Sequence, residues 1–312
     1  MTASGPRDVY VHHVSLMGTV VTIQVVGNGE TDDEHRARVE AVERAIGWFR
    51  SVEVCCSRFD PESELRQLSR QTGHAVRVSE MLFEAVRFAV AVAADTDGAF
   101  DPTVGVQMER RGFNRNYRTG EMAASGLDGG RPASYRDVVL DDAERTIALA
   151  RPLVLDLGAV AKGLAIDNAR LELGAFPNCA IDAGGDMFLA GRNRAGQPWA
   201  VGIRHPRKPD DVIETVHVSD TAVCTSGDYE RRAADGTSHI LDPAAESPAA
   251  EAASATVIAP TAMVADALAT AAFVLGPVRG IAMLERHGVE GLIVTPALER
   301  SQTSGFAALA HD

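Results

Sequence analysis

Asp266 and Thr270 are the residues whose types and spacing point most directly to chemistry. They stand four positions apart in residues 262–275, a segment otherwise made of small and apolar residues, so a helix would place both on one face. A carboxylate on such a helix is costly to bury unless a cation, a hydrogen-bond donor or a helix N-terminus compensates its charge. A carboxylate and a hydroxyl one turn apart also offer the hard oxygen ligands that Mg²⁺ prefers. The pattern by itself favours local capping or pairing of Asp266, with a Mg²⁺ site as the alternative.

Residues 155–163, which read LDLGAVAKG, form a second candidate site. An apolar run passes into a predicted helix through small residues that let a ligand approach the backbone closely. The free amides at the start of a helix attract anions. Because strand-to-helix turns that contain glycine are common, the alternative is an ordinary turn in which Lys162 is a surface lysine.

Two further polar segments contain paired glycines or a histidine. Residues 182–186 (DAGGD) permit either a tight turn or the close approach of a ligand, and the sequence favours neither. Residues 225–229 (TSGDY) precede His239, which begins the run HILDP at residues 239–243. Because imidazole titrates near neutral pH, His239 is the candidate for proton transfer. Taken alone, a structural or solvent-exposed histidine is the more common case.

The elements that must position these residues follow from hydrophobic periodicity. Helices are predicted over residues 34–53, over residues 81–94 with Ser79 as cap, from about residue 161, and over residues 262–275 with a stop at Gly276-Pro277. Strands are predicted at residues 20–26, 138–140, 146–150, 153–157, 179–182, 187–190, 199–204, 214–218 and 255–259, and an exposed loop at residues 120–134. A strand-rich middle favours an α+β fold with mixed or antiparallel sheets and flanking helices.

Composition limits the partners and the compartment. The 312 residues carry 43 acidic and 30 basic side chains, a formal charge of -13, which opposes binding to nucleic acid. Residues 1–13 contain neither the basic nor the apolar segment of a secretory signal, and no apolar run approaches the roughly 18 residues of a membrane span. The four cysteines show no CxxC spacing, which favours buried reduced thiols. We therefore expect a cytoplasmic protein without membrane insertion.

Taken in order, nine segments resemble the ApbE family of FAD:protein FMN transferases over nearly the whole chain. They are SLMGT at residues 15–19, SRFDP at 57–61, GAFDPTV at 98–104, LDLGAVAKG at 155–163, AGGD at 183–186, PW at 198–199, TSGDYER at 225–231, HILDP at 239–243 and ADALAT at 265–270. The resemblance changes the interpretation of Asp266 from a local structural role to a metal ligand. It also implies a single ApbE-like domain over residues 1–312, with a short flexible N-terminus of about residues 1–10.

The activity that the resemblance implies is a transfer of flavin. An Mg²⁺-dependent enzyme would take FAD as its substrate, move the FMN half onto a threonine or serine hydroxyl of an acceptor flavoprotein, and release AMP. Two alternatives stay open: an FAD pyrophosphatase that uses water and gives FMN and AMP, and an FAD-binding protein without turnover.

The resemblance also assigns roles to individual residues by matched position. Asp266, Thr270 and the backbone carbonyl of Ala161 would bind Mg²⁺, and His239 would be the general base. FAD would be contacted by Met17, Phe59, Ala99, Phe100, Asp101, Gly158, Leu164 and Leu241.

Three positions depart from the family pattern. Residues 244–248 (AAESP) replace the Thr-Gly and Pro that often follow HILDP, so the loop beside the flavin is expected to differ. Ala269 stands where some members carry a further acid, which would leave the metal site one carboxylate poorer. Arg111 occupies a position where an aromatic residue is frequent.

Overall fold

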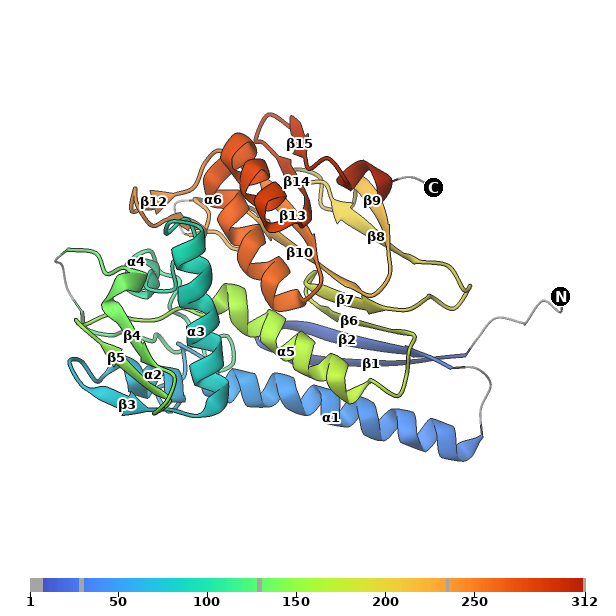
Figure 1. Cartoon of the computed structure of the whole chain (residues 1–312), viewed down its shortest axis with the longest axis horizontal. Coiled ribbons are helices and arrows are strands. Elements are labelled where there is room, and N and C mark those ends of the chain that lie inside the picture. Colours follow the sequence, from blue (N-terminus) through green and yellow to red (C-terminus); the bar gives the residue numbers. More distant parts are fainter. Residues whose placement is uncertain (1–7, 28–30, 128–130, 234–235, 311–312) are drawn as a thin grey trace.

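An antiparallel sheet of eight strands runs through the centre of the protein (Figure 1). The computed structural model describes residues 8–27, 31–127, 131–233 and 236–310. The strand order is β1-β2-β6-β7-β10-β13-β14-β15, and every neighbouring pair is antiparallel. The strands are β1 (Val9–Leu16), β2 (Thr19–Val26), β6 (Cys179–Ala183), β7 (Met187–Ala190), β10 (Thr221–Gly227), β13 (Ser254–Ala259), β14 (Glu290–Val294) and β15 (Arg300–Gln302).

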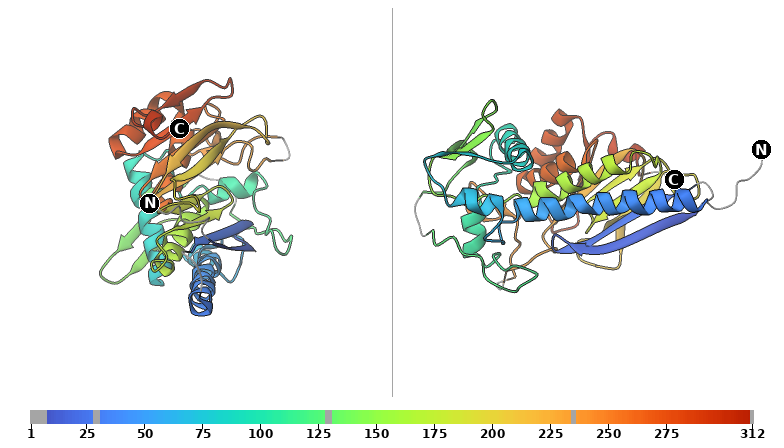
Figure 2. Two further views of the ribbon diagram at one scale, coloured as in Figure 1. Left: turned by 90° about the vertical axis from the view of Figure 1, so that its right-hand side faces the viewer. Right: turned by 90° about the horizontal axis from the view of Figure 1, so that it is seen from below.

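Three helices cover one face of this sheet, and α5 lies between α1 and α6 (Figures 1 and 2). They are α1 (Asp32–Cys56), α5 (Gly158–Glu172) and α6 (Ala262–His287). The helices α5 and α6 cross closely at Gly163, where an added Cβ would lie 2.4 Å from the Cα of Met263. Asp167 ties the same crossing together, because its carboxylate accepts hydrogen bonds from the amides of Ala262 (2.8 Å) and Met263 (3.0 Å). The start of α5 is therefore held against the first turns of α6.

A hairpin of β8 (Trp199–Arg204) and β9 (Val212–Val218) packs on a second, smaller hydrophobic cluster. Val201 and Val216 of the hairpin contribute to it together with Leu189 and Val223 of the sheet. The short helix η2 (Phe306–Ala308) adds Phe306 to the same cluster. The central sheet is thus buried by apolar side chains on both faces from β6 to β14, whereas Val11 of β1 and Val20 of β2 are exposed on the face away from the helices.

The remaining elements gather at one end of the central sheet (Figure 1). A three-stranded sheet there has the order β3-β5-β4, and a two-stranded ladder joins β11 to β12. These elements are α2 (Glu64–Ser69), β3 (Ala75–Arg77), α3 (Glu80–Asp95), α4 (Gly105–Arg110), η1 (Tyr135–Asp137), β4 (Val138–Asp141), β5 (Thr146–Leu149), β11 (Leu241–Asp242) and β12 (Ser247–Pro248).

The predicted α+β class is confirmed, as are most of the predicted elements. Ser79 caps α3 by accepting a hydrogen bond from the amide of Leu82 (3.2 Å). The predicted stop of the C-terminal helix lies at Gly276, whose backbone (φ 72°, ψ -177°) breaks α6, but a second helical segment follows at once. None of the four cysteines forms a disulfide, and all except the half-buried Cys55 are buried.

One predicted element, the strand at residues 153–157, is wrong. Residues 153–157 belong to no strand, because their backbone bonds to the segment that leads into α4: Gly105 donates to Val154 (3.1 Å) and Asp156 donates to Pro102 (2.7 Å). Of the segment predicted to be a flexible N-terminus, Val9 and Tyr10 pair with β2. Residues 1–7, and residues 128–130 of the predicted loop, lie outside the described residues.

The helix α6 is apolar over a longer stretch than expected from the sequence, from which no run long enough for a membrane span was predicted. By length and composition it could cross a membrane, with a mean hydropathy of 1.7 over its best 18-residue window. In the fold, 61% of that window is buried inside the protein, as is typical of a core helix. Its apolar character is thus accounted for by packing against α5, β10 and β13.

Candidate active site

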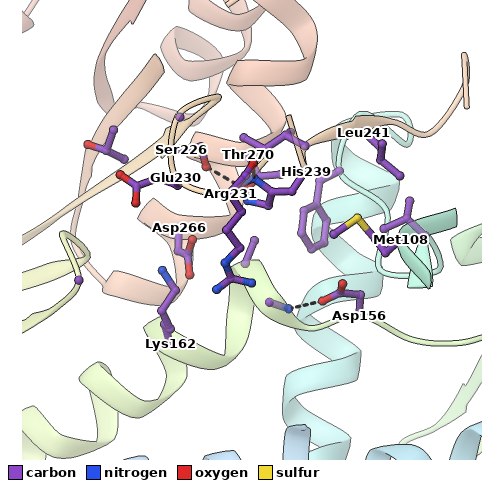
Figure 3. A pocket seen from close by; sticks show the side chains of 18 of the residues that line it. Met108, Asp156, Lys162, Ser226, Glu230, Arg231, His239, Leu241, Asp266 and Thr270 are labelled. Carbon is purple, nitrogen blue, oxygen red and sulfur yellow. Dashed lines mark hydrogen bonds between the residues drawn. The ribbon is translucent and has the colours of Figure 1, made fainter. Parts of the chain in front are cut away.

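A pocket of about 360 Å³ opens where the start of α5, α6, β10 and the β1–β2 turn meet (Figure 3). Nine of the residues singled out from the sequence line it, although they come from distant parts of the chain. These are Met17, Ala99, Phe100, Asp101, Gly158, His239, Leu241, Asp266 and Thr270. Phe59, Leu164 and Ala161 are not among the lining residues, and their roles stay predictions.

Asp266 is a buried carboxylate without full compensation. Its side chain is only 5% exposed, and Oδ2 has no hydrogen-bond partner among the described residues. Burial and the nearby charge of Asp186 raise the pKa of Asp266 to about 8, against the opposing effects of Lys162 and Arg231. A buried oxygen in this state is suited to a cation.

Two hydroxyl groups complete the oxygen-rich wall beside Asp266. Thr270 lies one turn further along α6, and its Oγ1 is 3.1 Å from Oγ of Ser226 on β10. Within the described ranges, no three His, Cys, Asp or Glu side chains cluster as a metal site. A cation bound here would therefore rely on one carboxylate and on neutral oxygen donors, which is a donor set that fits Mg²⁺.

Lys162 faces the pocket and is paired, so the surface-lysine alternative is wrong. Its ammonium forms an ion pair with the buried carboxylate of Asp186. Burial disfavours the charged form of Lys162, but Asp186 and Asp266 outweigh burial and raise its pKa. The pair joins α5 to the turn after β6, where Gly184 has a φ of 72° and a Cβ would lie 2.2 Å from Oγ1 of Thr19. The 182–186 segment is thus a tight turn that also lines the pocket through Gly184.

Asp156 lies at the opposite wall and is fully engaged. One carboxylate oxygen is 2.7 Å from Nε of Arg58, and the other accepts a hydrogen bond from the amide of Gly158 (2.8 Å). Burial opposes the charge of Asp156, but Arg58 and the Gly158 amide outweigh it and lower its pKa. Asp101 is similarly engaged, because it accepts bonds from Thr103 and from the amide of Tyr135 (3.0 Å). Both carboxylates shape the pocket and are not free bases.

His239 is held by the backbone of Arg231. The amide of His239 donates to the Arg231 carbonyl (3.2 Å), and its Nδ1 lies 3.3 Å from the same oxygen. Since a carbonyl only accepts, this contact requires the proton on Nδ1 and leaves Nε2 as an acceptor. Burial, together with the charge of Arg231, lowers the pKa of His239 to about 4. The imidazole is therefore neutral at neutral pH and able to accept a proton.

The structure shows the surroundings of the three positions that depart from the family pattern. Ala269 is fully buried in the core and does not line the pocket. Arg111 donates a hydrogen bond to Thr237 and so links α4 to the segment before His239. Residues 244–246 lie in the turn between β11 and β12, and residues 247–248 are β12 itself; Asp242 accepts bonds from the amides of Ala244 and Ala245 in this turn.

Comparison with known proteins decides the family. The sequence profile described as the ApbE family matches residues 17–293. The chain belongs to the ApbE family. The motif-based prediction is thereby confirmed, and the nine pocket residues above come from the matched range.

Relatives in the ApbE family share both sequence and fold with this chain. The FAD:protein FMN transferase of Treponema pallidum is 33% identical, over 90% of this chain and 83% of that protein. The FAD:protein FMN transferase of Vibrio cholerae is 30% identical, over 89% and 85%. The crystal structure of the ApbE protein of Thermotoga maritima superposes with a TM-score of 0.84 at 30% identity, covering 98% of this chain and 100% of that one. The structure of the Vibrio cholerae flavin transferase ApbE gives a TM-score of 0.82 at 26% identity, covering 97% and 100%.

Sequence reasoning missed several polar groups of this pocket. Ser226 and Arg231 of the pocket, and Asp186, which pairs with the pocket residue Lys162, lie inside quoted motifs but received no role. The pairing of Arg58 with Asp156 was not foreseen. Their positions inside the motifs were the signal from which a functional role could have been predicted. Their partners are distant in sequence, so spacing alone could not reveal them.

Proposed function

We propose that this chain is an FAD:protein FMN transferase that moves the FMN half of FAD onto a threonine or serine hydroxyl of an acceptor flavoprotein and releases AMP. The observation that carries the proposal is the meeting of Asp266, which has an uncompensated buried oxygen, with a neutral His239 in one pocket. One wall can hold a cation, and the other offers a base. Charge neutralisation by a cation and proton removal by a base each assist the transfer of a phosphoryl group between oxygens.

Mg²⁺ is the proposed metal, and Asp266, Thr270 and the carbonyl of Ala161 are the residues that would hold it. When bound, the ion neutralises charge on the pyrophosphate and on the departing phosphate. The support from this chain is the orphaned Oδ2 of Asp266 beside the hydroxyl pair of Thr270 and Ser226. Lys162 does not satisfy that oxygen: its ammonium pairs with Asp186, and Oδ2 of Asp266 has no hydrogen-bond partner among the described residues.

FAD would lie against the apolar lining residues and the turn at the start of α5. Met17, Phe100 and Leu241 present apolar surface suited to a flavin ring. The helix α5 begins beside the pocket at Gly158, so its positive N-terminal end favours a phosphate nearby, while the Gly158 amide itself is bonded to Asp156. This region is proposed as the FAD site together with Ala99, Asp101, Phe59 and Leu164.

The transfer step forms one bond and breaks one. The acceptor hydroxyl oxygen attacks the phosphorus of the FMN half, and its proton passes to Nε2 of His239. The bond from that phosphorus to the bridging oxygen breaks, and this oxygen leaves with AMP and keeps the electron pair. The product is a phosphoester between FMN and the acceptor side chain.

The proposal is tested by incubating the protein with FAD, Mg²⁺ and an acceptor flavoprotein. We expect a fluorescent acceptor band in a denaturing gel and one AMP for each flavin attached. Chromatography of FAD incubated with protein and Mg²⁺ alone identifies the alternatives. Release of FMN and AMP without an acceptor would indicate a pyrophosphatase, and binding of FAD without AMP would indicate a non-catalytic protein.

We further propose that the protein acts in the cytoplasm, without membrane insertion and without nucleic acid as a partner. The burial of α6 and the formal charge of -13 support these points. Fractionation of cells that express the full chain tests them, and recovery of the protein with the washed membrane fraction would contradict the first two.

A further inference from the structure

Arg231 is a cation of the pocket whose guanidinium has no hydrogen-bond or ion-pair partner among the described residues. It lines the pocket together with Lys162, and its guanidinium makes no hydrogen bond or ion pair with another described residue. Figure 3 shows its side chain extended toward the space between Asp266 and Asp156. Lys162, by contrast, is held by Asp186. The whole guanidinium of Arg231 is therefore available to a ligand.

The backbone of Arg231 is fixed even though its side chain is exposed. Its carbonyl accepts from the amide of His239, and the next residue, Arg232, forms a β-bridge with Ser238. These contacts hold the Cα of Arg231 beside the proposed general base. A long side chain on a fixed backbone can reach the centre of the pocket without moving the fold.

The adjacent Arg232 has a different environment. Its guanidinium is 3.8 Å from Asp228 and donates to the carbonyl of Gly236 (3.3 Å). It does not line the pocket. Of these two adjacent arginines, Arg231 thus presents its charge to the pocket, whereas Arg232 pairs with groups outside the pocket.

We propose that Arg231 binds the pyrophosphate of FAD directly and stabilises the negative charge that moves onto the departing AMP. This inference rests on the proposed function. A guanidinium presents five donors in a planar fork that matches phosphate oxygens, and it stays protonated throughout. As the bond to the bridging oxygen breaks, that oxygen keeps the electron pair, and Arg231 donates hydrogen bonds to the AMP phosphate without giving up a proton. The acceptor proton still goes to His239.

The test compares the binding of FAD and of riboflavin, which lacks phosphate, by the quenching of flavin fluorescence. We expect Arg231→Ala to raise the Kd for FAD by about 30-fold and to change the Kd for riboflavin by less than about twofold. Arg231→Lys keeps the charge but loses the planar fork of donors, so its Kd for FAD should lie between those of the wild type and Arg231→Ala. Arg232→Ala is the matched control and should bind both flavins like the wild type. Circular dichroism checks the fold of each variant.

Three results would overturn the proposal. Equal FAD affinity in Arg231→Ala and the wild type would exclude a contact with the pyrophosphate. An equal loss of FAD and riboflavin would show that Arg231 only shapes the pocket. A wild-type kcat for Arg231→Ala at saturating FAD would exclude its role toward the departing phosphate. If the wild type binds FAD with this dependence on Arg231 but never labels an acceptor, the proposed function fails while the contact stands.

Discussion

The hydroxyl oxygens of Ser226 and Thr270 lie 3.1 Å apart and join β10 to α6 at the wall of the pocket. In such a pair one hydroxyl donates its proton and the other accepts it. The contact holds the Thr270 side chain on the same side of α6 as Asp266. Ser226 therefore orients a proposed metal ligand without being one of those assigned from the sequence.

Removing this orientation should weaken the metal site. We expect Ser226→Ala to lower the affinity for Mn²⁺, used as a paramagnetic substitute for Mg²⁺ and titrated with FAD present, by about tenfold. Ser219→Ala, on the exposed turn before β10, is the control. Unchanged Mn²⁺ affinity in Ser226→Ala would show that Thr270 needs no partner or is not a ligand.

Asp266→Ala should abolish transfer and leave the fold intact. The loss of the metal-binding carboxylate is expected to lower the rate of FMN transfer by at least about 100-fold. The metal-free variant should unfold at the same temperature as the wild type or at a higher one, since Oδ2 of Asp266 is buried without a partner among the described residues. The gel assay measures the transfer rate, and thermal unfolding with and without Mg²⁺ measures the stability. Asp210→Ala, at an exposed position, is the control, and wild-type turnover in Asp266→Ala would refute the metal site.

The pH dependence of transfer should reflect the low pKa of His239. Burial, with a contribution from Arg231, lowers this pKa to about 4, so the imidazole is already a free base at pH 6. We expect the limb of the rate profile that belongs to His239 to lie near pH 4, and no loss from this group between about pH 8 and pH 6. His239→Gln should lack that limb. A limb near pH 6.5 that disappears in His239→Gln would show that the imidazole is exposed to water in the working enzyme.

The same shift makes a prediction about stability. The unfolded chain gains a proton on His239 near its usual pKa of about 6.5, whereas the folded chain gains it near pH 4. The unfolded state therefore binds more protons in this window, and acid lowers the free energy of unfolding between about pH 6.5 and about pH 4. Urea titrations across this range should give a smaller pH dependence for His239→Gln than for the wild type.

Gly163→Ala should be strongly destabilising. Its Cβ would lie 2.4 Å from Cα and 2.5 Å from the amide nitrogen of Met263, so α5 and α6 would have to separate. We expect a loss of about 3 kcal/mol in the free energy of unfolding, measured in urea. Gly47→Ala in α1 is the matched control, because its Cβ would meet nothing within 4 Å, and it should gain about 0.5 to 1 kcal/mol. Similar stabilities for the two variants would contradict the close crossing.

Glu53 should control the shape of the β1–β2 turn at the pocket. Met17 has a left-handed backbone (φ 54°), and its amide donates to Oε1 of Glu53 (3.0 Å), which also accepts from Tyr117 while Arg118 pairs with Oε2. Because a left-handed non-glycine residue needs external support, we expect Glu53→Gln to raise the Kd for FAD by about fivefold. It should also speed trypsin cleavage after Arg118. Glu43→Gln, exposed on the same helix, is the control. If Glu53→Gln changes neither the Kd for FAD nor the rate of cleavage, Glu53 does not support the turn.

The sequence by itself determined the family, the fold class and the local geometry of the site. The periodicity of residues 262–275 placed Asp266 and Thr270 on one face of a helix, and that helix is observed with Thr261 as its N-cap. Ser79, Gly276 and the β4–β5 hairpin were predictable for the same reason. Caps, stops and turns depend on neighbouring residues, and their signals are local.

The tertiary structure alone decided which distant groups meet. Lys162 and Asp186 are 24 residues apart, Met17 and Glu53 are 36 apart, and Ser226 and Thr270 are 44 apart. Residues 153–157 have the composition of a strand, but their backbone bonds to Pro102 and to Gly105 at the start of α4. The helix pattern shows only that Asp266 shares a face with Thr270. The packing of α5 and β10 against α6 is what buries the Asp266 carboxylate and leaves its Oδ2 without a partner among the described residues. Periodicity reports which face of an element is buried, whereas the identity of the neighbouring element depends on strand order and helix crossing.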